Sequence, residues 1–236
     1  MKKLTVREAA ALLSTSEKSV DRWIRQGVLP ACLINDEYRI NRAELLEWAT
    51  ARKMDTSPEI FAELEGGPSP TLEDALRAGG IHYGLAGRDK ESVLRSVIDT
   101  MELPEDVDPE FLYKVLLARE ALGSTGVGEG IAIPHVRNPI VLHLSRPIMA
   151  LCFLEQPVDF SALDGERVST LFTFVSPTVR AHLHLLSRLA FVLRDPRFKT
   201  TLRAQASRDE IFEALHAAEA AVTASARKTR TNASDG

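Results

Sequence analysis

Four glycines fall within the eight residues from Gly123 to Gly130, and this run constrains the fold more than any other local feature. A backbone so rich in glycine turns tightly and leaves room for a ligand beside it. The run lacks the Gly-Lys-Ser/Thr ending of a Walker loop, and it neither follows a strand nor opens a helix, as a dinucleotide fingerprint would. A short apolar strand over 131–133 follows instead, and it ends at Pro134 and His135. The sequence therefore predicts a tight turn that presents a histidine.

The segments around this turn alternate between helical and strand patterns. Apolar residues predict helices over 90–101, 109–122, 177–193 and 208–218, and buried strands over 147–154 and 168–175. Such alternation is typical of α/β architecture. The longest apolar run, 148–154, is far shorter than a membrane span requires.

Composition divides the chain of 236 residues into four parts. Residues 1–54 form a helical, mildly basic head, and residues 71–220 form the larger, acidic α/β body. Between them, residues 55–70 hold three prolines and two glycines, which indicates a linker. Residues 221–236 have almost no large apolar side chains, so we expect a disordered tail there.

The head carries the signals of two short helices joined by a tight turn. Thr5 and Glu8 form a capping box, and Ser16 caps a second helix. A hairpin with strands over 32–34 and 38–40 follows, and Asn41 then caps a third helix. The order helix, turn, helix, wing, helix predicts a small winged helix-turn-helix domain.

Residues suited to contacts with phosphates and base edges lie on the outer stripe of the second helix. The run TVREAAALLSTSEKSVDRWIRQGVLPA, followed by YRINRAELLEWA, resembles the excisionase/MerR-like winged helix-turn-helix family. The resemblance implies sequence-specific DNA binding, and the expected contacts are Lys18, Ser19, Arg22, Arg25 and, on the wing, Arg39. One copy would bind weakly, so a dimer is expected. A charged face on a protein-binding domain is the alternative, because Glu17 and Asp21 dilute the basic stripe.

The body contains two strings that are similar to one known family. REALGSTGVGEGIAIPH and SPTVRAHLHLLSRLAFVLRD resemble enzyme IIA of the bacterial phosphotransferase system, in its fructose/mannitol and nitrogen-related branch. The resemblance implies a mixed β-sheet flanked by helices, in which His135 accepts a phosphoryl group from the phosphocarrier HPr and His182 flanks it. His184 competes with His182 for that role.

Three further features bear on the predicted phosphoryl site. We expect Arg119 to supply a positive charge near His135, Thr125 to supply a hydroxyl, and Ser176-Pro177 to cap the helix of His182. Two residues depart from the family pattern, which often has Asn where Glu129 stands and Gly where Val136 stands. The added negative charge and the bulkier neighbour would slow phosphorylation or change the donor.

Because both resemblances occur in one chain, the sequence predicts a cytoplasmic regulator that couples phosphorylation of His135 to DNA or partner binding. One alternative is a phosphocarrier that relays phosphate to a sugar-transport IIB subunit, and another is a DNA-binding protein with a catalytically idle IIA-like sensor. No cofactor or metal is expected, since Cys32 and Cys152 belong to no metal-binding cluster and are interpreted as reduced core residues. The remaining histidines, His82, His143 and His216, are interpreted as surface or structural residues.

Overall fold

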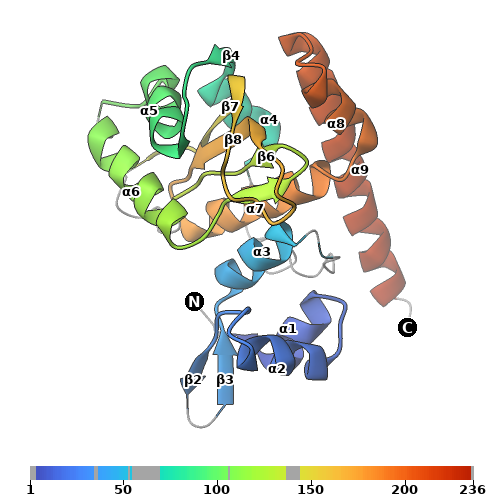
Figure 1. Cartoon of the computed structure of the whole chain (residues 1–236). Helices are drawn as coiled ribbons and strands as arrows, with labels where there is room; N and C mark the ends of the chain where they lie inside the picture. The colour runs from blue at the N-terminus through green and yellow to red at the C-terminus, as the bar shows by residue number, and fades with distance from the viewer. Residues whose placement is uncertain are drawn as a thin grey trace. The chain divides into compact units, whose positions relative to one another are not determined.

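The computed structural model describes residues 4–34, 37–52, 54, 70–105, 107–136 and 144–234. Backbone contacts divide the chain into two compact units, Met1–Gly67 and Pro68–Gly236 (Figure 1). Of the predicted linker only Pro70 lies in the described part, and His143 lies outside it. No helix in these described ranges is long and apolar enough to cross a membrane.

The first unit holds the predicted short helices and hairpin, and a short N-terminal strand that the sequence did not predict extends the hairpin to a three-stranded antiparallel sheet. The strand order is β1-β3-β2. The elements are β1 (Leu4–Thr5), α1 (Val6–Leu12), α2 (Glu17–Arg25), β2 (Cys32–Ile34), β3 (Glu37–Ile40) and α3 (Arg42–Ala51).

The helix caps predicted for α1 and α2 are present. The Thr5 hydroxyl accepts a hydrogen bond from the Glu8 amide at 3.1 Å, while the Glu8 carboxylate accepts one from the Thr5 amide at 2.8 Å. Ser16 accepts from the Ser19 amide at 3.2 Å. Each cap satisfies amide groups that the first turn of a helix leaves without a partner.

The second unit is built on a five-stranded mixed sheet. Its strands lie in the order β4-β7-β8-β6-β5, with β7–β8 and β5–β6 antiparallel and β4–β7 and β6–β8 parallel. The strands are β4 (Ile81–Leu85), β5 (Gly126–Gly128), β6 (Ile131–Ala132), β7 (Ile148–Val158) and β8 (Val168–Val175). The helices are α4 (Leu72–Gly79), α5 (Lys90–Thr100), α6 (Pro109–Ala121), α7 (Val179–Val192), α8 (Pro196–Arg203) and α9 (Arg208–Ser234).

Alternate residues of the interior strand β7 enter two separate cores, one on each face of the sheet. Ala150 and Cys152 pack with α5 and α6, whereas Met149, Leu151 and Phe153 pack with α4, α7, α8 and α9. Figure 1 shows these two groups of helices on opposite faces of the sheet. The alternation follows from the two-residue period of a strand and explains why β7 reads as a continuous apolar run.

The structure differs from the sequence prediction at the start of α7, at the end of α9 and in the burial of Cys32. Helix α7 begins after Thr178, whose hydroxyl accepts from the Ala181 amide, and not after Ser176-Pro177. Helix α9 continues to Ser234, through most of the segment that the sequence assigns to a disordered tail. Alanine is the best helix former, and an alanine-rich segment extends a helix without an apolar face to bury. Cys152 is fully buried, which raises the pKa of its thiol to about 12, but Cys32 is only half-buried.

Several short elements are absent from the sequence prediction: β1, α4, β4, β5 and α8. None exceeds eight residues. Periodic patterns need a longer window than such elements provide.

Candidate functional site

His135 lies three residues beyond the end of β6. It forms an isolated parallel bridge with Phe174 of β8, and its side chain is buried with 3% exposed. The ring Nδ1 lies 2.7 Å from the carbonyl oxygen of Ile133. Because a carbonyl only accepts, Nδ1 carries the proton in this geometry and the lone pair of the neutral ring lies on Nε2.

His182 is the neighbour of His135 in this structure. Their ring centroids are 5.1 Å apart, and Phe174 contacts both rings. His182 is the fourth residue of α7 and is fully buried. Two segments nearly fifty residues apart in the chain therefore bring two imidazoles together.

His184, the competing candidate, lies on another side of α7. Two residues correspond to about 200° around a helix, so His182 and His184 point in nearly opposite directions. Burial, together with the charges of Arg188 and Arg180, lowers the pKa of His184 to about 4, and its ring hydrogen-bonds to the backbone of Pro70. Of the two histidines, His182 is the one in ring contact with His135.

Arg119 and Thr125 make local contacts that the sequence does not reveal. Arg119 donates to the carbonyl of Gly123 at 2.9 Å. The Thr125 hydroxyl donates to the carboxylate of Glu120 at 2.7 Å, and its amide donates to the same carboxylate oxygen at 3.1 Å. Thr125 is thus joined to a buried carboxylate that the sequence prediction omitted.

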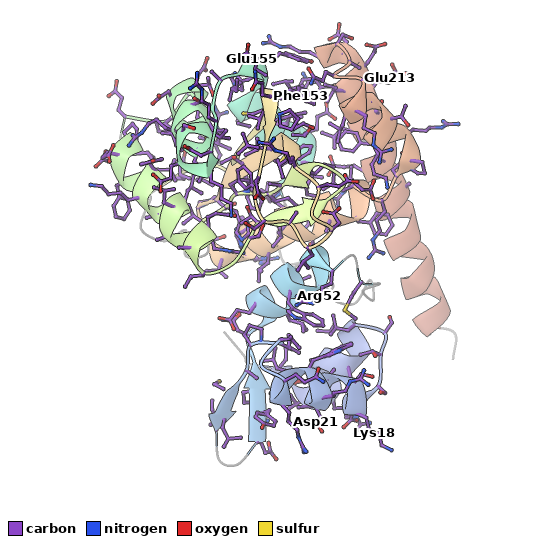
Figure 2. The ribbon with its side chains drawn as sticks, in the orientation of Figure 1. Lys18, Asp21, Arg52, Phe153, Glu155 and Glu213 are labelled. Atoms are coloured by element: carbon purple, nitrogen blue, oxygen red, sulfur yellow. The ribbon has the colours of Figure 1, made fainter. Side chains whose placement is uncertain are left out.

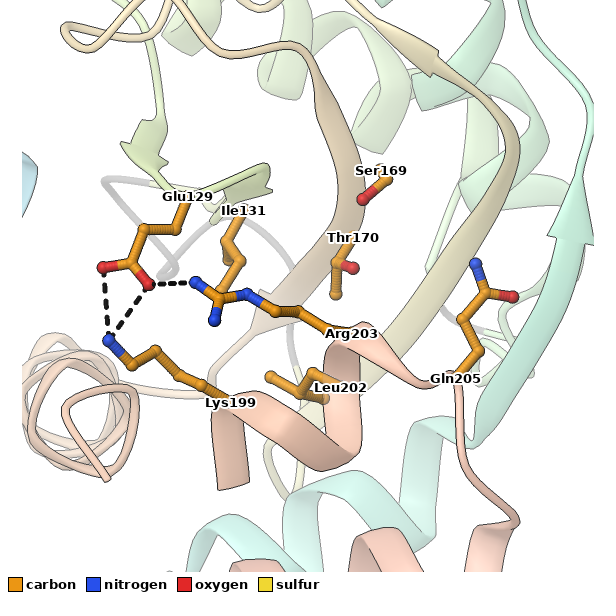
Figure 3. A pocket seen from close by; sticks show the side chains of 8 residues that line it. All are labelled: Glu129, Ile131, Ser169, Thr170, Lys199, Leu202, Arg203 and Gln205. Atoms are coloured by element: carbon orange, nitrogen blue, oxygen red, sulfur yellow. Dashed lines mark hydrogen bonds and ion pairs between the residues drawn. The ribbon is translucent and has the colours of Figure 1, made fainter. Parts of the chain in front are cut away.

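The carboxylate of Glu129, one of the two departures from the family pattern, is held by two cations of α8. It lies 3.0 Å from Lys199 and 2.8 Å from Arg203 (Figure 3). Its amide donates to Asp164 at 2.8 Å, and its φ of 56° is a left-handed conformation that favours Gly or Asn. These ion pairs offset the negative charge that the sequence led us to regard as unfavourable for phosphorylation.

The other departure, Val136, is a core residue. It is 1% exposed and packs in the same cluster as α5 and α6. A larger side chain beside the histidine is therefore accommodated by the core on that face of the sheet.

Two pockets in the second unit do not include His135 or His182. Glu129, Lys199 and Arg203 help to line a small cavity of about 30 Å³, which is large enough to hold water (Figure 3). A pocket of about 350 Å³ lies between α4, β4 and α9 and is lined in part by Arg77, His82 and Arg208. None of the site residues predicted from the sequence lines either pocket.

The other described histidines make local polar contacts. His82 hydrogen-bonds to the carbonyl of Gly79 at 2.9 Å, and the exposed His216 lies 3.1 Å from Glu73. Both contacts agree with their interpretation as structural or surface residues.

In the first unit, three predicted DNA contacts form an exposed stripe along α2. Lys18, Arg22 and Arg25 are exposed, and Figure 2 shows Lys18 projecting from the surface. The spacing of four and three residues places them on one side of the helix. Trp23, on another side, packs against Trp48 with ring centroids 4.9 Å apart, so it belongs to the core.

The other two predicted DNA contacts are engaged within the unit. Ser19 is half-buried and its hydroxyl lies 2.9 Å from the Ser16 hydroxyl. Arg39 forms an ion pair at 2.5 Å with Glu37 on the same strand. Both residues have partners that a nucleic acid would have to replace.

Comparisons with known proteins assign a family to each unit. The model of the family "Phosphoenolpyruvate-dependent sugar phosphotransferase system, EIIA 2" matches residues 75–218, and that of a helix-turn-helix domain family matches residues 4–53. Both matches lie within the boundaries of the two compact units.

Individual relatives resemble the second unit. The nitrogen regulatory protein of Pseudomonas aeruginosa is 37% identical over 146 residues, which cover 60% of this chain and 92% of that protein. The nitrogen regulatory protein of Escherichia coli K12 is 31% identical over 149 residues, covering 62% and 88%. The crystal structure of nitrogen regulatory protein IIA-Ntr from Neisseria meningitidis superposes with a TM-score of 0.51 and 29% identity, covering 57% of this chain and 92% of that one. The chain therefore belongs to the phosphotransferase system EIIA 2 family and carries a helix-turn-helix domain before its EIIA domain.

Proposed function

We propose that this protein is a cytoplasmic regulator in which a phosphoryl group on His135 reports the state of the phosphotransferase system to the helix-turn-helix head. The observation that supports this proposal best is the paired imidazoles of His135 and His182 inside the region matched by the EIIA family. The relatives named nitrogen regulatory proteins favour a regulatory role over a purely metabolic one.

The contact with the Ile133 carbonyl supports a specific mode of phosphoryl transfer. With the Nδ1 proton donated to that carbonyl, the Nε2 lone pair of His135 attacks the phosphorus of phosphorylated HPr in line. The Nε2–P bond forms as the P–N bond to the donor histidine breaks, and the donor imidazole leaves. Catalysis of such a step rests on positioning and on stabilisation of charge.

Neighbouring groups would stabilise the charge on the transferred phosphoryl oxygens. His182, with its ring beside that of His135, would donate a hydrogen bond to them. Arg119 is assigned a supporting role, since it lies in the last turn of the helix that precedes the glycine-rich turn. The hydroxyl of Thr125, which the sequence assigns to the same role, would have to leave the carboxylate of Glu120 to donate to a phosphoryl oxygen.

In this proposal the helix-turn-helix head binds DNA. Lys18, Arg22 and Arg25 of α2 would enter the major groove, with Ser19 beside them and Arg39 of the wing near the backbone. A homodimer would double this contact. Phosphorylation adds up to two negative charges, which would change dimerisation, partner binding or DNA access through electrostatics.

The first experiment is phosphorylation of the full chain with phosphoenolpyruvate, enzyme I and HPr, followed by intact-mass measurement. We expect one phosphoryl adduct on the wild-type protein, none on His135→Ala, and a normal adduct on His216→Ala, which changes an exposed histidine. If His135→Ala formed the phosphoryl adduct at the wild-type rate, the mechanism would be refuted.

The second experiment compares DNA binding by the two forms over a range of salt concentrations. A difference in affinity between the phosphorylated and unphosphorylated forms supports the regulator. Transfer of phosphate to a IIB subunit together with absent DNA binding would instead favour a phosphocarrier. If the wild-type protein forms no phosphoryl adduct and His135→Ala binds the operator as tightly as the wild type, the IIA-like domain is an idle sensor.

A further inference from the structure

Glu120 is a buried carboxylate that the proposed transfer step does not use. It lies in the last turn of α6 and is 7% exposed. A carboxylate near a helix C-terminus is disfavoured by the helix dipole, and a buried one is costly unless it is paired and hydrogen-bonded. The position of Glu120 therefore calls for specific partners.

Those partners connect Glu120 to the glycine-rich turn. Its Oε1 lies 3.3 Å from the Nζ of Lys90, on α5. Its Oε2 accepts from both the amide and the hydroxyl of Thr125, at 3.1 and 2.7 Å. The carboxylate thus holds Thr125, the residue immediately before strand β5.

A continuous series of hydrogen bonds leads from Thr125 to the ring of His135. The carbonyl of Thr125 accepts from the amide of Ile133 at 2.9 Å. The carbonyl of the same Ile133 lies 2.7 Å from Nδ1 of His135. Each bond restrains a residue whose other backbone group makes the next bond.

We propose that Glu120 is a positioning residue for phosphoryl acceptance, a role that rests on the function proposed above. Through Thr125 and Ile133, its carboxylate holds the carbonyl that keeps the proton of His135 on Nδ1 and the lone pair on Nε2. Loss of this support lets the Ile133 carbonyl move, so that a larger share of the rings carries the proton on Nε2 and cannot attack phosphorus there.

Three variants separate this role from a general effect on folding. Glu120→Ala removes every contact of the carboxylate. Glu120→Gln keeps an oxygen that accepts both Thr125 donors but removes the charge that Lys90 pairs with, and Lys90 retains its contacts with Ser161 and Phe160. Thr125→Val removes only the hydroxyl bond. The matched control is Glu110→Ala, which removes an exposed carboxylate of the same helix that pairs with Arg95 and Lys114.

The variants are compared by single-turnover phosphorylation from phosphorylated HPr and by ¹⁵N NMR of the His135 ring, which distinguishes the two tautomers. For Glu120→Ala we expect the rate at saturating donor to fall about tenfold, since misplacement of about 1 Å costs up to about 100-fold. The KM for the donor should stay unchanged because Glu120 is buried, and the Nδ1–H tautomer should lose population. Glu120→Gln should have the wild-type rate and the wild-type population of the Nδ1–H tautomer. Thr125→Val should give values between those of Glu120→Ala and the wild type, and Glu110→Ala should match the wild type.

Wild-type rate and tautomer in a folded Glu120→Ala protein would overturn the proposal, and so would an equal loss in Glu120→Gln. If Glu120→Ala does not fold, a wild-type tautomer and rate in Thr125→Val overturn it instead. If the wild-type protein accepts no phosphate, the proposed function fails. The tautomer comparison still decides the role of Glu120 in that case, because it needs no donor.

Discussion

His184 shows how the surroundings of one residue make the stability of this domain depend on pH. It is 8% exposed, and burial and the nearby charges of Arg188 and Arg180 lower its pKa from 6.5 to about 4. The folded state therefore holds this imidazole neutral at a pH where the unfolded chain protonates it. Between pH 6.5 and pH 4 the unfolded state binds more protons than the folded state.

We accordingly expect the contribution of His184 to be fully present above pH 6.5 and to be lost as the pH falls toward 4. A shift of this size corresponds to about 3 kcal/mol in the free energy of unfolding. Urea unfolding at pH 7.5 and pH 4.5 measures it. His184→Gln should reduce the difference in unfolding free energy between the two pH values. An identical pH dependence in wild type and His184→Gln would contradict this account.

Residue-scale contacts also explain how the chain tolerates Glu129. The sequence shows an acidic side chain where the family often has Asn, and it shows nothing of Lys199 and Arg203, which follow 70 or more residues later. The pairing depends on the packing of α8 against the β5–β6 turn, which no local pattern encodes.

At the scale of elements, the junction of α4, α7 and α9 depends on one buried carboxylate. Glu219 of α9 accepts from the amides of Leu72 and Glu73 in the first turn of α4, at 3.1 and 3.3 Å. It also accepts from Arg188 of α7 at 2.9 Å. A carboxylate at a helix N-terminus is favoured by the helix dipole, so Glu219 caps α4 from another helix.

We expect Glu219→Ala to destabilise the second unit by about 3 kcal/mol, because it leaves the Arg188 guanidinium and the α4 amides without this acceptor. Glu219→Gln should lose less, since an amide oxygen still accepts hydrogen bonds. Glu213→Ala, an exposed change on the same helix, serves as the control. The urea midpoint measures the effect, and an unchanged midpoint for Glu219→Ala would show that the junction does not depend on this contact.

The elements themselves were predictable where a local pattern is long. Strand β8 and the helices α5 and α6 lie where the sequence predicts them, to within one or two residues, because their apolar periodicity spans the element and Asp89 and Asp108 cap the helices locally. Helix α4 and strand β4 were not predicted. They are short, and part of what holds α4, the carboxylate of Glu219, comes from a residue 147 positions later.

At the scale of the whole molecule, the two compact units have separate cores and separate proposed roles. Changes to the DNA-contact surface of the first unit should therefore leave the chemistry of the second unchanged. This independence can be tested in the intact chain.

For Arg22→Ala we expect weaker DNA binding. The slope of log affinity against log salt concentration should become shallower by about one, which is the contribution of one phosphate contact. Phosphorylation of His135 should proceed at the wild-type rate. Arg197→Ala removes the same charge from an exposed position in the second unit and should leave DNA binding unchanged. Fluorescence anisotropy over a salt series, with the mass assay in parallel, measures both. Unaltered DNA affinity in Arg22→Ala would remove α2 from the proposed interface.

The sequence by itself determined the features that depend on neighbours in the chain. Thr5, Glu8 and Ser16 cap their helices as predicted, because a cap and the amide it satisfies are separated by three residues. The resemblance carried by the glycine-rich turn and by the helix of His182 is likewise supported by the family match. Only the tertiary structure decided that His182 and not His184 contacts His135, and that Glu120 and Glu219 hold the turn and α4. Those contacts depend on which side of a helix faces the site and on the approach of residues far apart in the chain. A local pattern of residues determines neither.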